Sequence, residues 1–216
     1  RMAGGPLSCW YAGDVHDRPP LSEYMVGCDI AAGTGGDQSS NSVNSVLDRR
    51  TGEQVAEYVT MHDEPKKFAR SSVALCHFFY GAYLAWEHNG AVGKSFAMEI
   101  LDLQYGNIYR GPRGDHLRPK SITRKPGWWN TPEALGEALD ALMSGWEQGK
   151  VVCRNRLVPS EARQYVWKDG KPVHDRTINT DDESNKGKSH GDRVVAMALA
   201  YVGLRDRPYG GSGKPK

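Results

Sequence analysis

The segment GDRVVAMALAYVGL, residues 191–204, constrains the fold more than any other part of this 216-residue chain. It has helical spacing but is apolar nearly all round, and such a helix is stable only when it is buried. The chain is long enough to form one substantial α/β core, or at most two small domains. We therefore expect the last helix to lie inside the core.

The order of the other apolar patterns indicates a mixed α/β plan with about five main strands. Strands are expected at 24–30, 41–48, 53–60, 83–86 and 151–153, and helices at 66–81, 92–103, 131–146 and 191–204. Short polar and glycine-containing turns separate the first three strands, which are therefore expected to pair antiparallel. Thr131 and Pro132 suit the start of a helix, and Asp169-Gly170 suits the turn of a small β-hairpin.

Composition favours a single globular domain over residues 21–206. Residues 1–20 are rich in Gly, Pro and Asp and are expected to be an arm or linker remnant, and residues 207–216 a disordered tail. The start at Arg1-Met2 suggests a fragment of a longer protein. No apolar run approaches the roughly 18 residues that a membrane span needs, so no membrane partner is expected.

The stretch EHNGAVGKS, residues 87–95, ends like a nucleotide-binding P-loop. A P-loop needs glycine five residues before its second glycine, because the backbone N–H groups must curl around phosphate. His88 stands there instead, and Glu87 would repel a triphosphate. The segment therefore does not predict an ATPase, and Glu87 is its candidate functional residue.

Three acidic residues stand at the ends of buried elements. Asp29 ends the first strand, Glu87 follows the fourth, and a right-handed crossover would place these two strands parallel. If they are neighbours, about 4.8 Å apart, both carboxylates lie at one edge of the sheet. Asp192 opens the last helix and shares a stripe with Val195 and Leu199, so it faces the sheet.

Carboxylates that converge in this way repel each other unless cations lie between them. Hard oxygen ligands suit Mg²⁺ or Mn²⁺, and two such ions can hydrolyse a phosphodiester without a covalent nucleophile. A strand-end aspartate is also typical of a turn, and Asp192 alone would also suit a helix cap. Asp37 and His190 lie close to these acids in the sequence and are accessory candidates.

Four segments carry a family likeness, in this order along the chain: GCDIAAGTGGDQSSNSVNSVLDRRTGE, WEHNGAVG, PGWWNTPEALGEAL and KSHGDRVVAMALAY. Together they resemble the nuclease domain of tailed-bacteriophage large terminase subunits, over about residues 22–204. The resemblance implies an RNase H-like fold and a metal-dependent endonuclease that cuts concatemeric double-stranded DNA during genome packaging. It also implies that Asp29, Glu87 and Asp192 bind two Mg²⁺ or Mn²⁺ ions, with Asp37 as an accessory acid.

The same resemblance implies where the full-length protein acts and with which partners. The full-length protein would work with its ATPase domain, a portal and a small terminase subunit in the host cytoplasm. This chain departs from that plan, because it contains no motor motif. It is therefore expected to cut DNA but not to move it.

Net charge is only +2, so DNA binding would need local patches. The predicted phosphate contacts are Lys94, Arg113, Arg118, Lys120, Arg124 and Lys125. Binding by such residues is independent of sequence and sensitive to salt. Trp128 and Trp129, which follow the basic loop, are expected to fold into the core. Lys168 and Lys171 of the hairpin are weaker candidates for guiding a strand.

Two further interpretations stay open. A Holliday-junction resolvase or a transposase-like nuclease uses three carboxylates in the same way, but acts on branched or end-specific DNA. A non-catalytic module that docks to the packaging motor would show no response to metal and no effect of Asp29→Ala.

Overall fold

The computed structural model describes residues 5–14, 16–35, 40–111, 126–175 and 191–207. Its centre is a five-stranded sheet with the order β1-β4-β3-β2-β5. The strands are β1 (Leu7–Cys9), β2 (Tyr24–Asp29), β3 (Ser42–Asp48), β4 (Gln54–Thr60) and β5 (Tyr83–Trp86). The predicted antiparallel pairing of β2, β3 and β4 is confirmed, and β5 runs parallel to β2.

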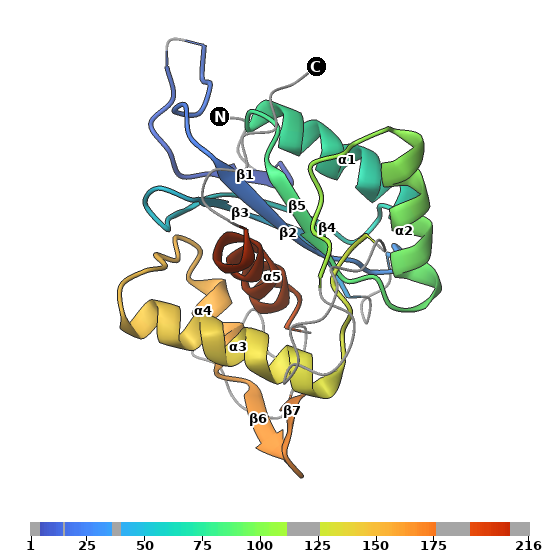
Figure 1. Ribbon diagram of the computed structural model, residues 1–216, viewed down its shortest axis with the longest axis vertical. Helices are drawn as coiled ribbons and strands as arrows, with labels where there is room; N and C mark the ends of the chain where they lie inside the picture. The colour runs from blue at the N-terminus through green and yellow to red at the C-terminus, as the bar shows by residue number, and fades with distance from the viewer. Residues whose placement is uncertain (1–4, 15, 36–39, 112–125, 176–190, 208–216) are drawn as a thin grey trace.

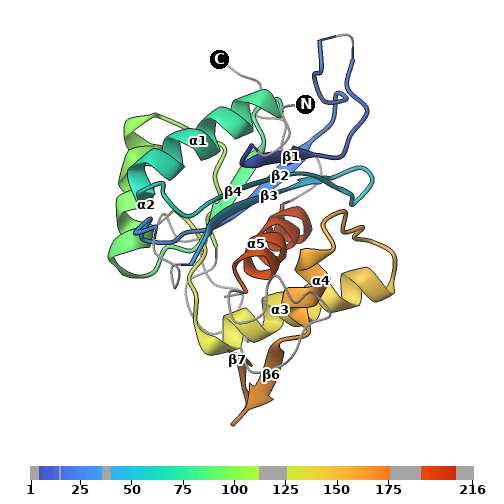
Figure 2. The same cartoon turned by 180° about the vertical axis from the view of Figure 1, so that it is seen from behind.

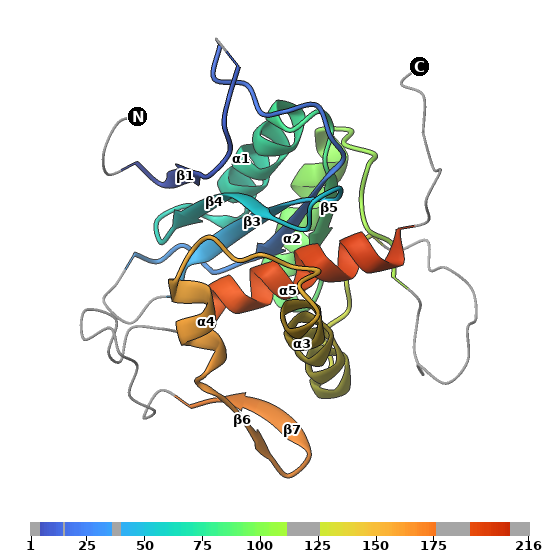
Figure 3. The ribbon, with the colours of Figure 1, turned by 90° about the vertical axis from the view of Figure 1, so that its left-hand side faces the viewer.

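The helices are α1 (Pro65–Phe78), α2 (Gly90–Asp102), α3 (Pro132–Glu147), α4 (Leu157–Ala162) and α5 (Asp192–Asp206). Figures 1 and 2 show α1 and α2 together on one face of the sheet and α5 on the other. In Figure 3, α5 lies between the sheet and the pair formed by α3 and α4. The last helix is therefore covered on both sides, as its apolar surface requires.

Side chains of β2 alternate between two hydrophobic clusters. Tyr24, Val26 and Cys28 pack in the cluster beneath α1 and α2. Met25 packs in the cluster that surrounds α5. By the same alternation, Gly27 and Asp29 belong to the α5 face.

Gly27 is the point of closest approach between the sheet and α5. A Cβ added there would lie 2.0 Å from the carbonyl oxygen of Ala196 and 2.3 Å from the backbone nitrogen of Ala200. Small residues one turn apart on the helix thus meet a strand residue without a side chain. This contact lets the helix backbone rest directly on β2.

The structure differs from expectation at three places. Residues 151–153 are not a strand, since only Val152 forms an isolated bridge, to Glu53. The fifth strand is β1, within the predicted arm, which pairs with β4 through Leu7 and Tyr58. Helix α4 was not expected from the sequence.

The expected start of α3 and the expected hairpin turn are confirmed. Thr131 accepts a hydrogen bond from the backbone N–H of Ala134 at the start of α3. The hairpin consists of β6 (Tyr165–Lys168) and β7 (Lys171–His174), and Asp169 and Gly170 both have positive φ, as a two-residue turn of this kind requires. The predicted tail beyond residue 207 lies outside the described residues. In the described part of the chain, no helix is long and apolar enough to cross a membrane.

Gly27→Ala should destabilise the protein strongly, because the new methyl group would collide with the backbone of α5. Overpacking of this kind costs about 1–3 kcal/mol or more. The measurement is thermal unfolding followed by circular dichroism. Gly106→Ala is the matched control, since a Cβ there meets nothing within 4 Å. Equal melting temperatures for the two variants would contradict the close packing of α5 on β2.

Candidate active site

The parallel pairing of β2 and β5 brings two of the predicted acids together. The register ends with Cys28 opposite Trp86, so the next residues along the two strands are Asp29 and Glu87. Both carboxylates follow residues that face the α1 and α2 side, so alternation directs them to the α5 face. The predicted meeting of these two strand ends at one edge of the sheet is confirmed.

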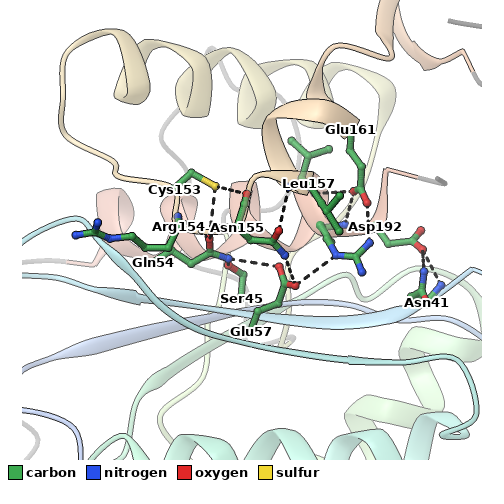
Figure 4. A network of polar contacts seen from close by, with 12 residues as sticks. Asn41, Ser45, Gln54, Glu57, Cys153, Arg154, Asn155, Leu157, Glu161 and Asp192 are labelled. Atoms are coloured by element: carbon green, nitrogen blue, oxygen red, sulfur yellow. Dashed lines mark hydrogen bonds and ion pairs between the residues drawn. The ribbon is translucent and has the colours of Figure 1, made fainter. Parts of the chain in front are cut away.

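Asp192 reaches the same region from the first residue of α5. It is only 5% exposed, and its Oδ2 accepts a hydrogen bond of 2.6 Å from the backbone N–H of Asn41. The side-chain amide of Asn41 approaches the same oxygen at 3.4 Å. Figure 4 shows Asp192 turned toward Asn41, which stands just before β3.

The charges of the three carboxylates act on one another. Burial raises the pKa of Asp29 well above its usual range, and the negative charges of Asp192 and Glu87 raise it further. Asp29 still keeps partial contact with solvent. Neighbouring charges of one sign in such a place favour uptake of a proton or a cation.

Two asparagines orient Glu87. The side-chain amide of Asn130 donates to Oε2 of Glu87 at 3.0 Å, and the backbone N–H of Asn130 donates to Oδ1 of Asn89 at 2.9 Å. Burial raises the pKa of Glu87, and the bond from Asn130 lowers it in part. No sequence pattern points to Asn130, because nothing local links it to Glu87, a residue 43 positions away.

The glycine of the P-loop-like sequence has a structural explanation. A Cβ at Gly93 would lie 2.5 Å from the carbonyl oxygen of Glu87 and 2.7 Å from the carbonyl carbon of His88. Gly93 therefore lets the first turns of α2 pack against the chain that carries Glu87.

A buried ion-pair network fixes the start of α5. Glu161 of α4 accepts hydrogen bonds from the backbone N–H of Arg193 at 2.8 Å and of Val194 at 3.3 Å. The Arg193 guanidinium bridges Glu161 at 2.9 Å and Glu57 at 3.3 Å. These contacts hold the residue next to Asp192 by its backbone and by its side chain. Sequence reasoning missed Glu161, which lies on a short helix that gives no periodic signal.

The carboxylate set fits hard divalent cations in its chemistry, because its donors are oxygens and its charges repel one another. Among the described residues, no three His, Cys, Asp or Glu side chains stand in a ready-made metal-binding group. The charges of Asp29, Glu87 and Asp192 thus act on one another. The three carboxylates do not by themselves form a complete set of metal ligands. The predicted accessory residues Asp37 and His190 lie outside the described residues.

Most of the predicted DNA contacts also lie outside the described residues, namely Arg113, Arg118, Lys120, Arg124 and Lys125. The two ends of their loop are described. Arg110 and Gly127 form a β-bridge, and Trp128 forms one with Glu87. The basic loop therefore leaves and returns beside the candidate site.

The remaining predicted contact, Lys94, is exposed near the start of α2. Of the two tryptophans, Trp128 is buried at 7% exposure, whereas Trp129 is 53% exposed, so the expectation of a core position holds only for Trp128. On the hairpin, Lys168 pairs with Asp175 at 3.2 Å.

Comparisons with known proteins support the fold. No protein-family model and no curated protein matches the sequence. The large terminase nuclease from thermophilic phage G20c with bound magnesium is 21% identical, with a TM-score of 0.63, over 92% of this chain and 87% of that chain. The form with bound cobalt gives 22% identity and a TM-score of 0.62 over the same shares.

The large terminase nuclease domain of Thermus phage P74-26 is 21% identical, with a TM-score of 0.57, over 91% of this chain and 85% of that chain. The chain has the fold of a large terminase nuclease domain. Its mixed sheet, flanked by helices on both faces, is the RNase H-like arrangement expected from the sequence. For this terminase nuclease fold, the predicted acids stand at the carboxyl ends of the parallel pair and at the start of the buried helix.

Asp29→Asn should raise the melting temperature measured in EDTA, an unusual result for a half-buried polar position. At neutral pH, Asp29 must keep its charge against its neighbours or take up a proton, and both cost folding free energy. If the substitution removes about 1 kcal/mol of this cost in folding free energy, the melting temperature should rise by roughly 2–4 °C. The same variant should lose the further rise that Mn²⁺ gives the wild-type protein.

Asp102→Asn is the matched control, because Asp102 is exposed at the end of α2. It should follow the wild-type protein in both conditions. A full Mn²⁺-dependent rise in Asp29→Asn would contradict a cation site at these carboxylates.

Proposed function

We propose that this chain is a metal-dependent endonuclease that cleaves concatemeric double-stranded DNA during phage genome packaging. The observation that carries the proposal is the convergence of Asp29, Glu87 and Asp192 at one sheet edge of a terminase nuclease fold. Fold alone does not determine chemistry. Two carboxylates at the end of a parallel strand pair, with a third at the start of the buried helix, are suited to metal-dependent hydrolysis of a phosphodiester.

The three acids share one role in the proposed reaction. The proposed ligands of two Mg²⁺ or Mn²⁺ ions are the carboxylates of Asp29, Glu87 and Asp192, whose charges act on one another. Hydrogen bonds from Asn130 and Asn41 would keep Glu87 and Asp192 in their orientations. When bound, two such ions activate a water molecule for attack and stabilise the charge on the leaving 3′ oxygen.

The DNA would lie across the edge where the basic loop begins and ends. Lys94 and the arginines and lysines of residues 110–125 supply the proposed phosphate contacts. Such contacts fix the position of a duplex without reading its sequence, so cleavage should show little sequence preference. In the full-length protein, an ATPase domain, a portal and a small terminase subunit are the proposed partners, in the host cytoplasm.

A supercoiled-plasmid assay tests this function. Wild-type protein should nick and linearise the plasmid with Mn²⁺ or Mg²⁺ and leave it intact in EDTA. Asp29→Ala and Asp192→Ala should cut at background level, because each removes an oxygen ligand. Asp102→Ala, on the exposed end of α2, should cut like the wild type. Raising the salt concentration should slow cutting steeply, since phosphate contacts dominate binding.

The other outcomes separate the alternatives. Folded protein that cuts no DNA with any divalent metal would overturn the nuclease and favour the docking module. Strong preference for four-way junctions over duplex would overturn the packaging role and favour a resolvase-like enzyme.

A further inference from the structure

Tyr165 stands where the β6–β7 hairpin meets the start of α5. It pairs in register with His174, and the two rings make an edge-to-face contact at 5.1 Å between centroids. A Cβ added to Gly191 would lie 2.6 Å from the Tyr165 hydroxyl oxygen and 2.9 Å from Cδ2 of His174. The first residue pair of the hairpin therefore rests on the residue immediately before Asp192.

The hairpin makes a second contact two residues further along β6, on the same face of that strand. A Cβ added to Gly136 of α3 would lie 2.7 Å from Cη2 of Trp167. The hairpin thus packs against α3 and against the turn that begins α5. Together, these two contacts fix the Tyr165 ring relative to Asp192. A side chain that acts in catalysis needs neighbouring residues that hold it in position in this way.

The negative charges of the candidate site act on the Tyr165 hydroxyl. Burial raises the pKa of Tyr165, and the charges of Asp29, Asp192, Glu161 and Glu87 each raise it further. The hydroxyl therefore keeps its proton and can donate a hydrogen bond. Among the residues that the structure describes, no acceptor for this donor is found.

We propose that Tyr165 is a further catalytic residue of the candidate nuclease site, where its hydroxyl donates a hydrogen bond to a non-bridging oxygen of the phosphodiester under attack. The inference rests on the proposed function and deepens it. Negative charge grows on the non-bridging oxygens as the new bond from the water oxygen to phosphorus forms and the bond to the 3′ oxygen breaks. A fixed donor aimed at that charge stabilises the transition state more than the ground state.

A neutral phenol suits this place better than a charged donor or a second acid. It adds no negative charge to a region that already holds several carboxylates. It also does not compete with a cation for those carboxylates, as a lysine or arginine would. Tyr165 keeps its own proton throughout the reaction. The proton of the attacking water leaves to solvent, and the leaving 3′ oxygen takes up a proton from solvent.

The first test compares Tyr165→Phe with Tyr201→Phe. Tyr201 is a matched control, because it is buried and packs on a glycine in the same way, with its hydroxyl 3.0 Å from a Cβ added to Gly145. It lies nine residues along α5 from Asp192, roughly 14 Å away at 1.5 Å per residue. Single-turnover cleavage of plasmid should slow about 100-fold in Tyr165→Phe, as expected for loss of one transition-state donor.

Three readouts separate catalysis from packing. The DNA concentration at half-saturation, the melting temperature in EDTA and its rise with Mn²⁺ should stay at wild-type values in Tyr165→Phe. Tyr201→Phe should cleave at the wild-type rate. Equal cleavage rates for wild type and Tyr165→Phe would overturn the inference while leaving the proposed nuclease intact. A slow Tyr165→Phe variant that has also lost its response to Mn²⁺ would overturn it in favour of a purely structural role.

The second test does not depend on cleavage. In protein labelled with ¹³C at tyrosine Cζ, the Tyr165 signal is identified by its absence from the spectrum of Tyr165→Phe. Addition of paramagnetic Mn²⁺ should broaden that signal in the wild-type protein but not in Asp29→Asn, and should leave the Tyr201 signal sharp. If wild-type protein cuts no DNA, the proposed function fails, and the spectrum alone decides whether Tyr165 belongs to the metal site. A sharp Tyr165 signal at saturating Mn²⁺ would overturn the placement.

Discussion

The direct packing of α5 on β2 is the contact on which the rest of the structure depends. At Gly27, the strand has no side chain, and Ala196 and Ala200 bring the helix backbone onto it. A side chain at position 27 would push the helix off the strand and carry Asp192 away from Asp29. The apolar surface of α5 would then lose its close contact with the sheet. The glycine at this position thus sets both the packing of the core and the separation of the acids.

That packing has an electrostatic cost. It gathers Asp29, Glu87 and Asp192 in a region where burial and mutual repulsion raise the pKa of Asp29. A fold selected for stability alone would place apolar or neutral residues there. Proteins place residues that reduce stability mainly at functional sites. The large core on either side of α5 offsets the free-energy cost of bringing these acids together.

Much of this arrangement could be predicted from the sequence, because it follows from periodicity and topology. Alternation along β2 and β5, together with a parallel crossover, puts Asp29 and Glu87 on one edge and one face. The orienting residues could not be predicted. Asn41 and Asp192 are separated by 151 residues, so only the tertiary structure brings them together. Strand β1 was hidden for a similar reason: a strand of three residues in a Gly- and Pro-rich segment exists through its pairing with β4.

The hydrogen bonds described above to Glu87 and Asp192 come from neutral donors. Asn130 and the backbone N–H of Asn41 orient Glu87 and Asp192, but amides bring no positive charge. Arg193, the residue next to Asp192, directs its guanidinium to Glu57 and Glu161 instead. Had that arginine reached Asp192, an ion pair would occupy the position proposed for a divalent cation. Neutral donors thus set the directions of Glu87 and Asp192, and in the proposed nuclease the charges of these carboxylates would bind divalent cations, with the Tyr165 hydroxyl as a further neutral donor.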